Sequence, residues 1–181
     1  MVNHNPESDD LALVRRAALG DEGAYHRLVD AHAQRLFRLA SSLVGNAADA
    51  EDVVQETFAG AYAGLKKFEQ RSSVKTWLTS ICVIQAAKWR RDKKRRAEQE
   101  LASHGHQASD DATDVDRRVD LHAALGKLSA EHREVLVLRE FEQLSYDQIS
   151  AVLGIPRGTV ESRLHRARAD LRARLPEYAK Q

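Results

Sequence analysis

The sequence predicts an all-α protein made of two small helical domains joined by a flexible linker. Almost every hydrophobic repeat in its 181 residues has the three- or four-residue spacing of a helix, and no segment shows the alternation of a strand. A polar, acidic stretch at residues 99–116 interrupts these repeats. We therefore expect domains at residues 1–97 and 118–181, with a linker at residues 98–117 between them.

Hydrophobic spacing predicts four helices before the linker. The first ends at Gly20-Asp21, and the second carries leucines from Leu28 to Leu43. The third is capped by Asp49 or a neighbouring residue and runs to about Lys67. The fourth begins near Ser73 and continues into the basic run "KWRRDKKRR" at residues 88–96. We expect Trp77 to be buried at the start of this helix.

After the linker, helical spacing resumes at Val119 and continues through residues 131–141 to a final helix pair. Ser145 suits the N-cap of the first helix of this pair, and Gly154 suits a left-handed residue at its end. Pro156 opens the second helix with its φ angle already set. This stop and restart within a few residues is typical of a helix-turn-helix.

The last helix has two chemically different sides. Its apolar residues fall on one face, at Val160, Leu164, Ala167 and Leu171. Its other side carries Thr159, Ser162, Arg163 and Arg166. Because arginine bonds phosphates or the O6 and N7 atoms of guanine, such a helix suits the DNA major groove. The alternative is an ordinary helical hairpin whose basic face is solvated.

Charge is segregated along the chain, although the net charge is only +1. The run at residues 88–96 holds seven basic residues against Asp92, whereas residues 98–120 and the stretch before Gly60 lean acidic. Separate charged surfaces indicate separate partners, with nucleic acid favoured for the basic one. The alternative is that the basic run only adds solubility.

The third predicted helix also has an acidic side. Apolar residues from Val54 to Leu65 share one face, while Asp52, Gln55 and Glu56 occupy the other. This pattern occurs in ordinary amphipathic helices with a solvated side. Beside a DNA-binding domain, however, an acidic face is better suited to a protein partner, because phosphates would repel it.

The sequence argues against several other classes of protein. No apolar run approaches the roughly 20 residues of a membrane span, and the first residues lack the pattern of a secretory signal, so we expect a cytoplasmic protein without membrane insertion. Cys82 lies in an apolar run and is expected to be buried. His104 and His106 have no further ligands nearby, so we expect no metal, no cofactor and no catalytic residues.

Three segments together resemble the sigma-70 family, in particular its extracytoplasmic-function (ECF) group. "LSYDQISAVLGIPRGTVESRLHRARADLRARL" is similar to region 4, and "DAEDVVQETF" is similar to region 2.2. "FEQRSSVKTWLTSICVIQAAKWRRDKKRR" is similar to regions 2.3 and 2.4. The resemblance covers about residues 11–96 and 119–175, in the family's order.

This resemblance implies a specificity subunit of bacterial RNA polymerase that aids promoter melting and is regulated by an anti-sigma factor. It assigns docking on the clamp helices of the largest subunit of the core polymerase to Asp49, Glu51, Asp52, Gln55 and Glu56. It assigns capture of a flipped base and binding of the nontemplate −10 strand to Glu69, Gln70, Arg71, Ser72, Ser73, Lys75, Lys88, Arg90 and Arg91. It assigns recognition of the −35 duplex to Arg157, Thr159, Ser162, Arg163 and Arg166.

Two positions depart from the family's pattern. Val83-Ile84 stands where many relatives carry Arg-Asn, which removes a base-reading asparagine from the fourth helix. Glu161 stands where many relatives carry lysine. A stand-alone helix-turn-helix regulator is the rival hypothesis, and "DAEDVVQETF" argues against it. An accessory protein of a nuclease or recombinase is a third hypothesis, for which the expected acidic metal cluster is not visible.

Overall fold

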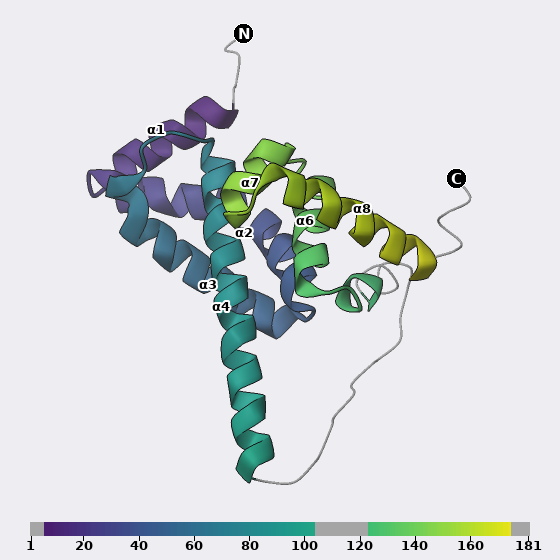
Figure 1. The fold of residues 1–181 in the computed structure, drawn as a ribbon. Coiled ribbons are helices and arrows are strands. Elements are labelled where there is room, and N and C mark those ends of the chain that lie inside the picture. Colours follow the sequence, from purple (N-terminus) through teal and green to yellow (C-terminus); the bar gives the residue numbers. More distant parts are fainter. Residues whose placement is uncertain (1–5, 104–122, 175–181) are drawn as a thin grey trace.

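The computed structural model describes residues 6–103 and 123–174, and within these residues it contains helices and turns but no strand (Figure 1). The all-α prediction is confirmed. The elements are α1 (Pro6–Ala18), α2 (Glu22–Val44), α3 (Ala47–Gly64), the 3-10 turn η1 (Leu65–Lys67), α4 (Val74–Ser103), α6 (Ala130–Glu140), α7 (Tyr146–Leu153) and α8 (Arg157–Arg174).

Short polar side chains fix where the first helices begin. The side chain of Asp21 accepts a hydrogen bond from the backbone N–H of Ala24 at 2.9 Å and so caps α2. α2 ends at Gly45, whose left-handed φ of 92° lets its N–H reach the carbonyl of Ser41. The cap of α3 is Asn46, which accepts from the N–H of Asp49 at 2.9 Å. A neighbour of Asp49 is therefore the cap.

The helices α1 to α4 form one bundle, in which α2 packs against α1, α3 and α4. Leucines of α2 and Leu78 of α4 are fully buried at its centre. On α3 the buried stripe runs through Ala50, Val53, Thr57 and Ala61, whereas Val54, predicted to lie in it, is only half-buried. Small residues at these positions let α3 approach α2 and α4 closely.

The second group is the predicted helix-turn-helix with α6 behind it. Ser145 and Gln148 form a capping box at the start of α7, through bonds of 2.8 and 3.2 Å between each side chain and the other's backbone N–H. Gly154 ends α7 with a left-handed φ of 64°. Val160, Leu164 and Ala167 are buried along α8, and Leu171 packs partly buried beside them, as the spacing predicts.

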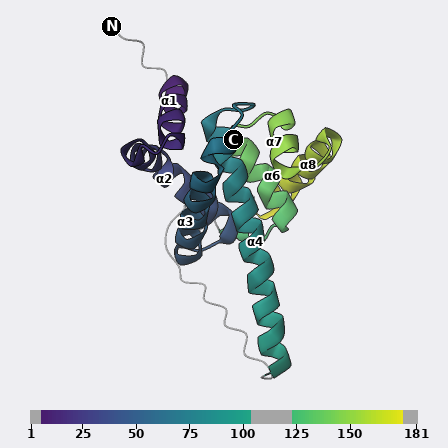
Figure 2. The same cartoon turned by 90° about the vertical axis from the view of Figure 1, so that its left-hand side faces the viewer.

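The two groups pack against each other through α4 with α7 and α2 with α6, and their buried residues form one continuous cluster. In Figures 1 and 2 the C-terminal half of α4 extends away from both groups. Because α4 continues to Ser103, residues 99–103 are helical, which contradicts the predicted start of the flexible linker. Glu98, Gln99 and Glu100 favour a helix, and Lys94 pairs with Glu98 one turn on at 3.8 Å. The remaining predicted linker residues and their histidines lie outside the described residues.

Gly154→Ala should lower the free energy of unfolding by about 1–2 kcal/mol, because alanine is strained at a left-handed φ. A Cβ at this position would meet nothing within 4 Å, so the cost arises from the backbone alone. Denaturant unfolding followed by circular dichroism measures the change. The matched control is Gly158→Ala in α8, where a Cβ is equally free and φ is helical. The control should raise stability by about 0.4–1 kcal/mol, and equal losses in both variants would contradict the argument.

Candidate functional site

The acidic side of α3 is open to solvent. Glu51, Asp52, Gln55 and Glu56 are all exposed, on the side of the helix away from the buried stripe. Asp49 differs from these four, because it sits partly buried in the first turn with the Nζ of Lys93 at 3.3 Å. The structure therefore presents four of the five predicted docking side chains together on one accessible surface.

The acidic surface adjoins the basic part of α4. A cavity of about 230 Å³ between the two helices is lined by Asp52 and Glu56 on one side and by Lys88, Trp89 and Arg96 on the other. Lys93 lies over the Trp89 ring, 4.5 Å from its centre. Two surfaces of opposite charge, suited to different partners, thus share one edge.

The loop between η1 and α4 carries five predicted −10 residues. Glu69 and Arg71 form an exposed ion pair at 2.6 Å, and Ser72 is exposed. Gln70 has a left-handed φ of 57° and accepts a hydrogen bond from Arg15 of α1 at 2.9 Å. The Oγ of Ser73 accepts from the N–H of Thr76 at 3.1 Å, so Ser73 begins α4 as predicted.

A cavity lies beside this loop. It has a volume of about 410 Å³ and is lined by α1, η1, Phe68 and Gln70. Trp77 packs on Phe68 with 4.7 Å between ring centres and is partly buried against the bundle, whereas the sequence predicted that it would be buried. The lining from α1, including Leu11 and Arg15, was not predicted, because nothing in the sequence brings α1 to the loop.

The remaining predicted −10 residues divide between two sides of α4. Lys88 and Arg91 are exposed. Lys75 and Arg90 point to the helix-turn-helix group, where Arg90 forms an ion pair with Glu134 of α6. The sequence treated these cations as one set, but only Lys88 and Arg91 are free of the second group.

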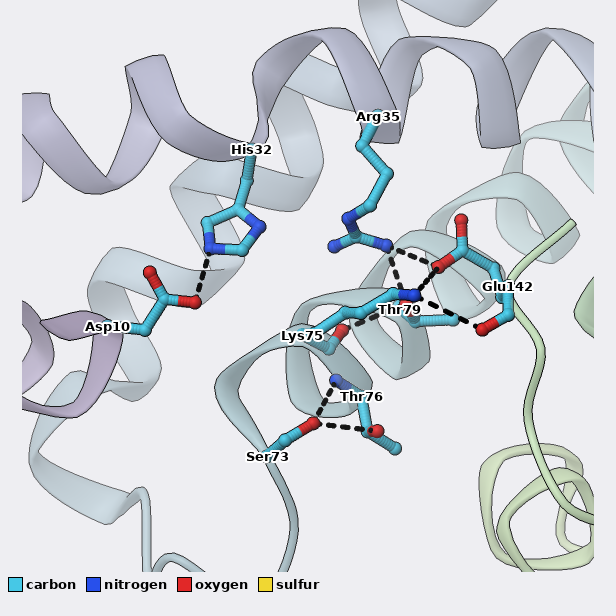
Figure 3. A network of polar contacts seen from close by, with 8 residues as sticks. All are labelled: Asp10, His32, Arg35, Ser73, Lys75, Thr76, Thr79 and Glu142. Carbon is cyan, nitrogen blue, oxygen red and sulfur yellow. Dashed lines mark hydrogen bonds and ion pairs between the residues drawn. The ribbon is translucent and has the colours of Figure 1, made fainter. Parts of the chain in front are cut away.

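Lys75 belongs to a buried polar network centred on Glu142, in the loop between α6 and α7 (Figure 3). Glu142 is only 4% exposed and accepts a hydrogen bond from Arg35 Nη1 at 2.6 Å. Arg35 Nη1 also lies 3.0 Å from the Oγ1 of Thr79. The Nζ of Lys75 donates to the carbonyl of Glu142 at 3.2 Å and lies 3.7 Å from its carboxylate. One loop of the second group is thus bound by two cations of the first.

Two further polar groups lie at or near this junction, His32 within the first group and Arg133 across the two groups. Burial lowers the pKa of His32 below its usual value, although Asp10 lies 2.9 Å from its Nε2 (Figure 3). Arg133 of α6 donates to the carbonyl of Leu43 at 3.0 Å, across the two groups, and to the carbonyls of Leu125 and Gly126 within its own. Burial also lowers the pKa of Arg133. Sequence reasoning missed Arg35, Arg133 and Glu142, because their partners lie far away along the chain.

The predicted −35 residues on α8 differ in their exposure and in whether a carboxylate binds them. Ser162 and Arg166 are exposed, and Thr159 is half-buried. Arg157 is held by Asp147 and Glu161, both at 3.1 Å. Arg163 is tied to Glu131 of α6 at 2.9 Å. His165 is exposed between Ser162 and Arg166 and was not predicted, although its position in the sequence places it on the same side.

The described residues show no group of three or more side chains suited to a metal ion, and none of their helices is long and apolar enough to cross a membrane. Cys82 is fully buried, and burial raises the pKa of its thiol to about 12. The thiol therefore stays protonated and acts as part of the core, as predicted.

A four-helix bundle followed by a helix-turn-helix, with acidic side chains exposed on α3 and cations on α4 and α8, points to a transcription initiation factor. The family models for sigma-70 region 2 and sigma-70 region 4 match residues 28–96 and 118–171. The chain belongs to the sigma-70 family, as an ECF sigma factor, and is not an enzyme.

Individual relatives agree with this assignment. The chain is 36% identical to the ECF RNA polymerase sigma factor SigE of Mycolicibacterium smegmatis, over 90% of this chain and 66% of the relative. It is 35% identical to the RNA polymerase sigma-H factor of Pseudomonas aeruginosa, over 90% of this chain and 91% of the relative. A solved structure of the sigma factor RpoE in complex with the anti-sigma factor NepR from Bartonella quintana superposes with a TM-score of 0.70 at 29% identity, over 84% of this chain and 96% of that one.

Proposed function

We propose that this ECF sigma factor binds core RNA polymerase through α3, captures a −10 base beside the loop at residues 69–75, and reads the −35 duplex with α8. The observation that carries the proposal is the presence of three separate surfaces of different chemistry on one chain. They are the exposed acids of α3, the cavity beside the loop, and the exposed side of α8 around Arg166.

The acidic surface is the docking site for the clamp helices of the largest polymerase subunit. Glu51, Asp52, Gln55 and Glu56 need no rearrangement to meet a partner, because they are already exposed on a rigid helix. A basic partner surface would be attracted to these acids, whereas DNA phosphates would be repelled. Asp49 acts at the margin of this contact, because Lys93 already neutralises part of its charge.

The cavity beside the loop receives an extruded base of the nontemplate strand. Its volume of about 410 Å³ is ample for a nucleobase, and the polar loop residue Gln70 lines it. Capture of the base offsets a few kcal/mol of unstacking and so favours the melted strand without ATP. Lys88 and Arg91 hold the neighbouring phosphates.

The helix-turn-helix lies in the major groove at −35, with Ser162 and Arg166 against base edges and phosphates. The chain divides into a first domain at residues 1–97 and a second at residues 118–181, and α4 runs from the first into the connecting segment as far as Ser103. A connecting segment lets both domains bind one promoter and raises the effective concentration of the second domain once the first is bound. We place the protein with its polymerase in the cytoplasm.

An anti-sigma factor is the proposed regulator. The RpoE relative is in complex with the anti-sigma factor NepR, and its fold matches this chain over both domains. A partner of this class would compete with polymerase and promoter for the same surfaces, and so hold the sigma factor inactive without changing its fold.

Asp52→Lys and Glu56→Lys should each weaken binding to purified core polymerase by about tenfold or more, because they place a cation against a basic partner surface. Fluorescence-detected titration of core with labelled protein measures the affinity. Asp30→Lys on α2 is the matched control, since it reverses an equally exposed acid on another helix, and should change affinity less than about twofold. Loss of binding in all three variants, or in none, would contradict the assigned interface. If the unaltered protein neither bound core polymerase nor produced specific transcripts, the proposed sigma function itself would be wrong.

Arg166→Ala should reduce −35-dependent transcription by roughly 5- to 100-fold, which corresponds to loss of one good base contact. Transcription by reconstituted holoenzyme from a pool of promoter fragments measures both efficiency and sequence preference. Arg172→Ala is the control on the same helix, because Arg172 lies nearer its C-terminal end, away from the turns that contact bases. A uniform small loss across all promoters in both variants would show that Arg166 does not read sequence.

A further inference from the structure

Ile84 is an apolar side chain on the open side of α4. It is 57% exposed, whereas Val83 beside it is 5% exposed and Cys82 is fully buried. Burial of these two neighbours fixes the rotation of the helix about its axis. Ile84 therefore faces solvent as a consequence of the packing of α4.

The face of α4 that carries Ile84 is cationic after it, and before it holds Ser80 beside the partly buried Trp77 and Ile81. Ser80 lies one turn before Ile84, and Lys88 and Arg91 lie one and two turns after it, all at helical spacing. Lys88 and Arg91 are exposed and are the two predicted −10 cations within α4 that the second group leaves free. A face of this composition combines phosphate-binding groups with one apolar contact point.

We propose that Ile84 recognises the 5-methyl group of a thymine in the −10 element while Lys88 and Arg91 hold the adjacent phosphates. This proposal rests on the proposed function of α4. Isoleucine neither donates nor accepts a hydrogen bond, and the one feature of a base edge that suits an apolar side chain is the thymine methyl group. The cations on the same face favour DNA as the partner over an apolar protein surface.

The thymine methyl can be removed without any change to the protein. Each thymine of the −10 element is replaced in turn by deoxyuridine, and open-complex formation by reconstituted holoenzyme is measured. We expect a loss of about fourfold at one position, the value for one buried methyl-sized group. The Ile84→Ala holoenzyme should bind the unaltered promoter that much more weakly and be insensitive to deoxyuridine at the same position.

Ser80→Ala on the same face is the matched control and should keep the full sensitivity to deoxyuridine. The proposal is overturned if the unaltered protein shows no methyl-sensitive position, or if Ile84→Ala keeps the sensitivity. It is also overturned if Ile84→Ala weakens every promoter equally, which would indicate contact with the polymerase. Failure of the sigma function is distinguishable, because no holoenzyme would then transcribe at all.

An independent observation concerns the junction between the two groups. Lys75 and Arg90, assigned to the −10 strand, are both bound by carboxylates of the second group, Glu142 and Glu134. A carboxylate oxygen and a phosphate oxygen make the same kind of contact with these cations. The carboxylates of the second group therefore occupy the two cationic side chains that the phosphates of DNA would need.

We infer that Glu134 and Glu142 form an autoinhibitory contact that opens when the two domains bind promoter DNA. Binding at −10 and −35 separates the domains along the duplex and exchanges carboxylate for phosphate at Lys75 and Arg90. The junction is not fully satisfied. Among the described residues, no partner reaches Nε or Nη2 of Arg35, which are buried there, so the closed arrangement retains a desolvation cost that opening relieves. The free energy needed to open the contact lowers the apparent affinity for DNA.

Energy transfer between dyes at Arg27→Cys on α2 and Arg172→Cys on α8 reports the separation of the groups, since the buried Cys82 does not compete for labelling. Glu134→Gln combined with Glu142→Gln should lower the transfer efficiency and strengthen open-complex formation by about three- to tenfold. Glu140→Gln is the control, because its partner Arg168 lies within the second group. Unchanged transfer, or opening without stronger promoter binding, would overturn the inference. Glu134→Gln alone, at the more accessible pair, gives the same test should the double variant fold poorly.

Discussion

The buried carboxylate of Glu142 constrains how the two halves of the molecule are arranged. A charge at 4% exposure is stable only when it is paired and hydrogen-bonded. Its partners, Arg35 and Lys75, come from the first group, so the loop after α6 remains buried only while the groups are together. Hydrophobic contact brings the groups together, and this pairing selects one orientation. Arg133 donates a hydrogen bond to the carbonyl of Leu43 and so favours the same orientation of the two groups.

α4 connects the surfaces of the protein because each of its sides has a different neighbour. One side completes the bundle with α2 and α3, another meets α7, and the open side carries Ile84, Lys88 and Arg91. A helix is rigid, so these sides cannot rotate independently. Burial of Val83 and Leu78 thus determines which side chains of α4 face solvent. The position proposed for DNA contact at Ile84 is in this way a consequence of the core.

Features that depend on neighbours in the sequence were predictable. The capping box at Ser145, the left-handed Gly154 and the buried stripe of α8 follow from local rules, and the structure agrees. Prediction failed where distant segments decide the outcome. The resemblance assigned Lys75 and Arg90 to the −10 strand together with Lys88 and Arg91, yet Glu142 and Glu134 bind the first two. The predicted linker begins too early, because composition marks residues 99–103 as polar while their helix propensity remains high.

In the first turn of α8, the departure from the family pattern at Glu161 changes which side chains are available for the proposed −35 contact. Glu161 stands where many relatives carry lysine, and here it holds Arg157 together with Asp147. These hydrogen bonds and charges raise the pKa of Arg157, but the pairs are exposed, and exposed pairs contribute little to stability. A phosphate can therefore displace them, whereas the neighbouring negative charge of Glu161 remains. In the proposed −35 contact, recognition then rests on the exposed Ser162, which directly follows Glu161, and on Arg166 one turn after it, neither of which has a carboxylate bound in the described residues.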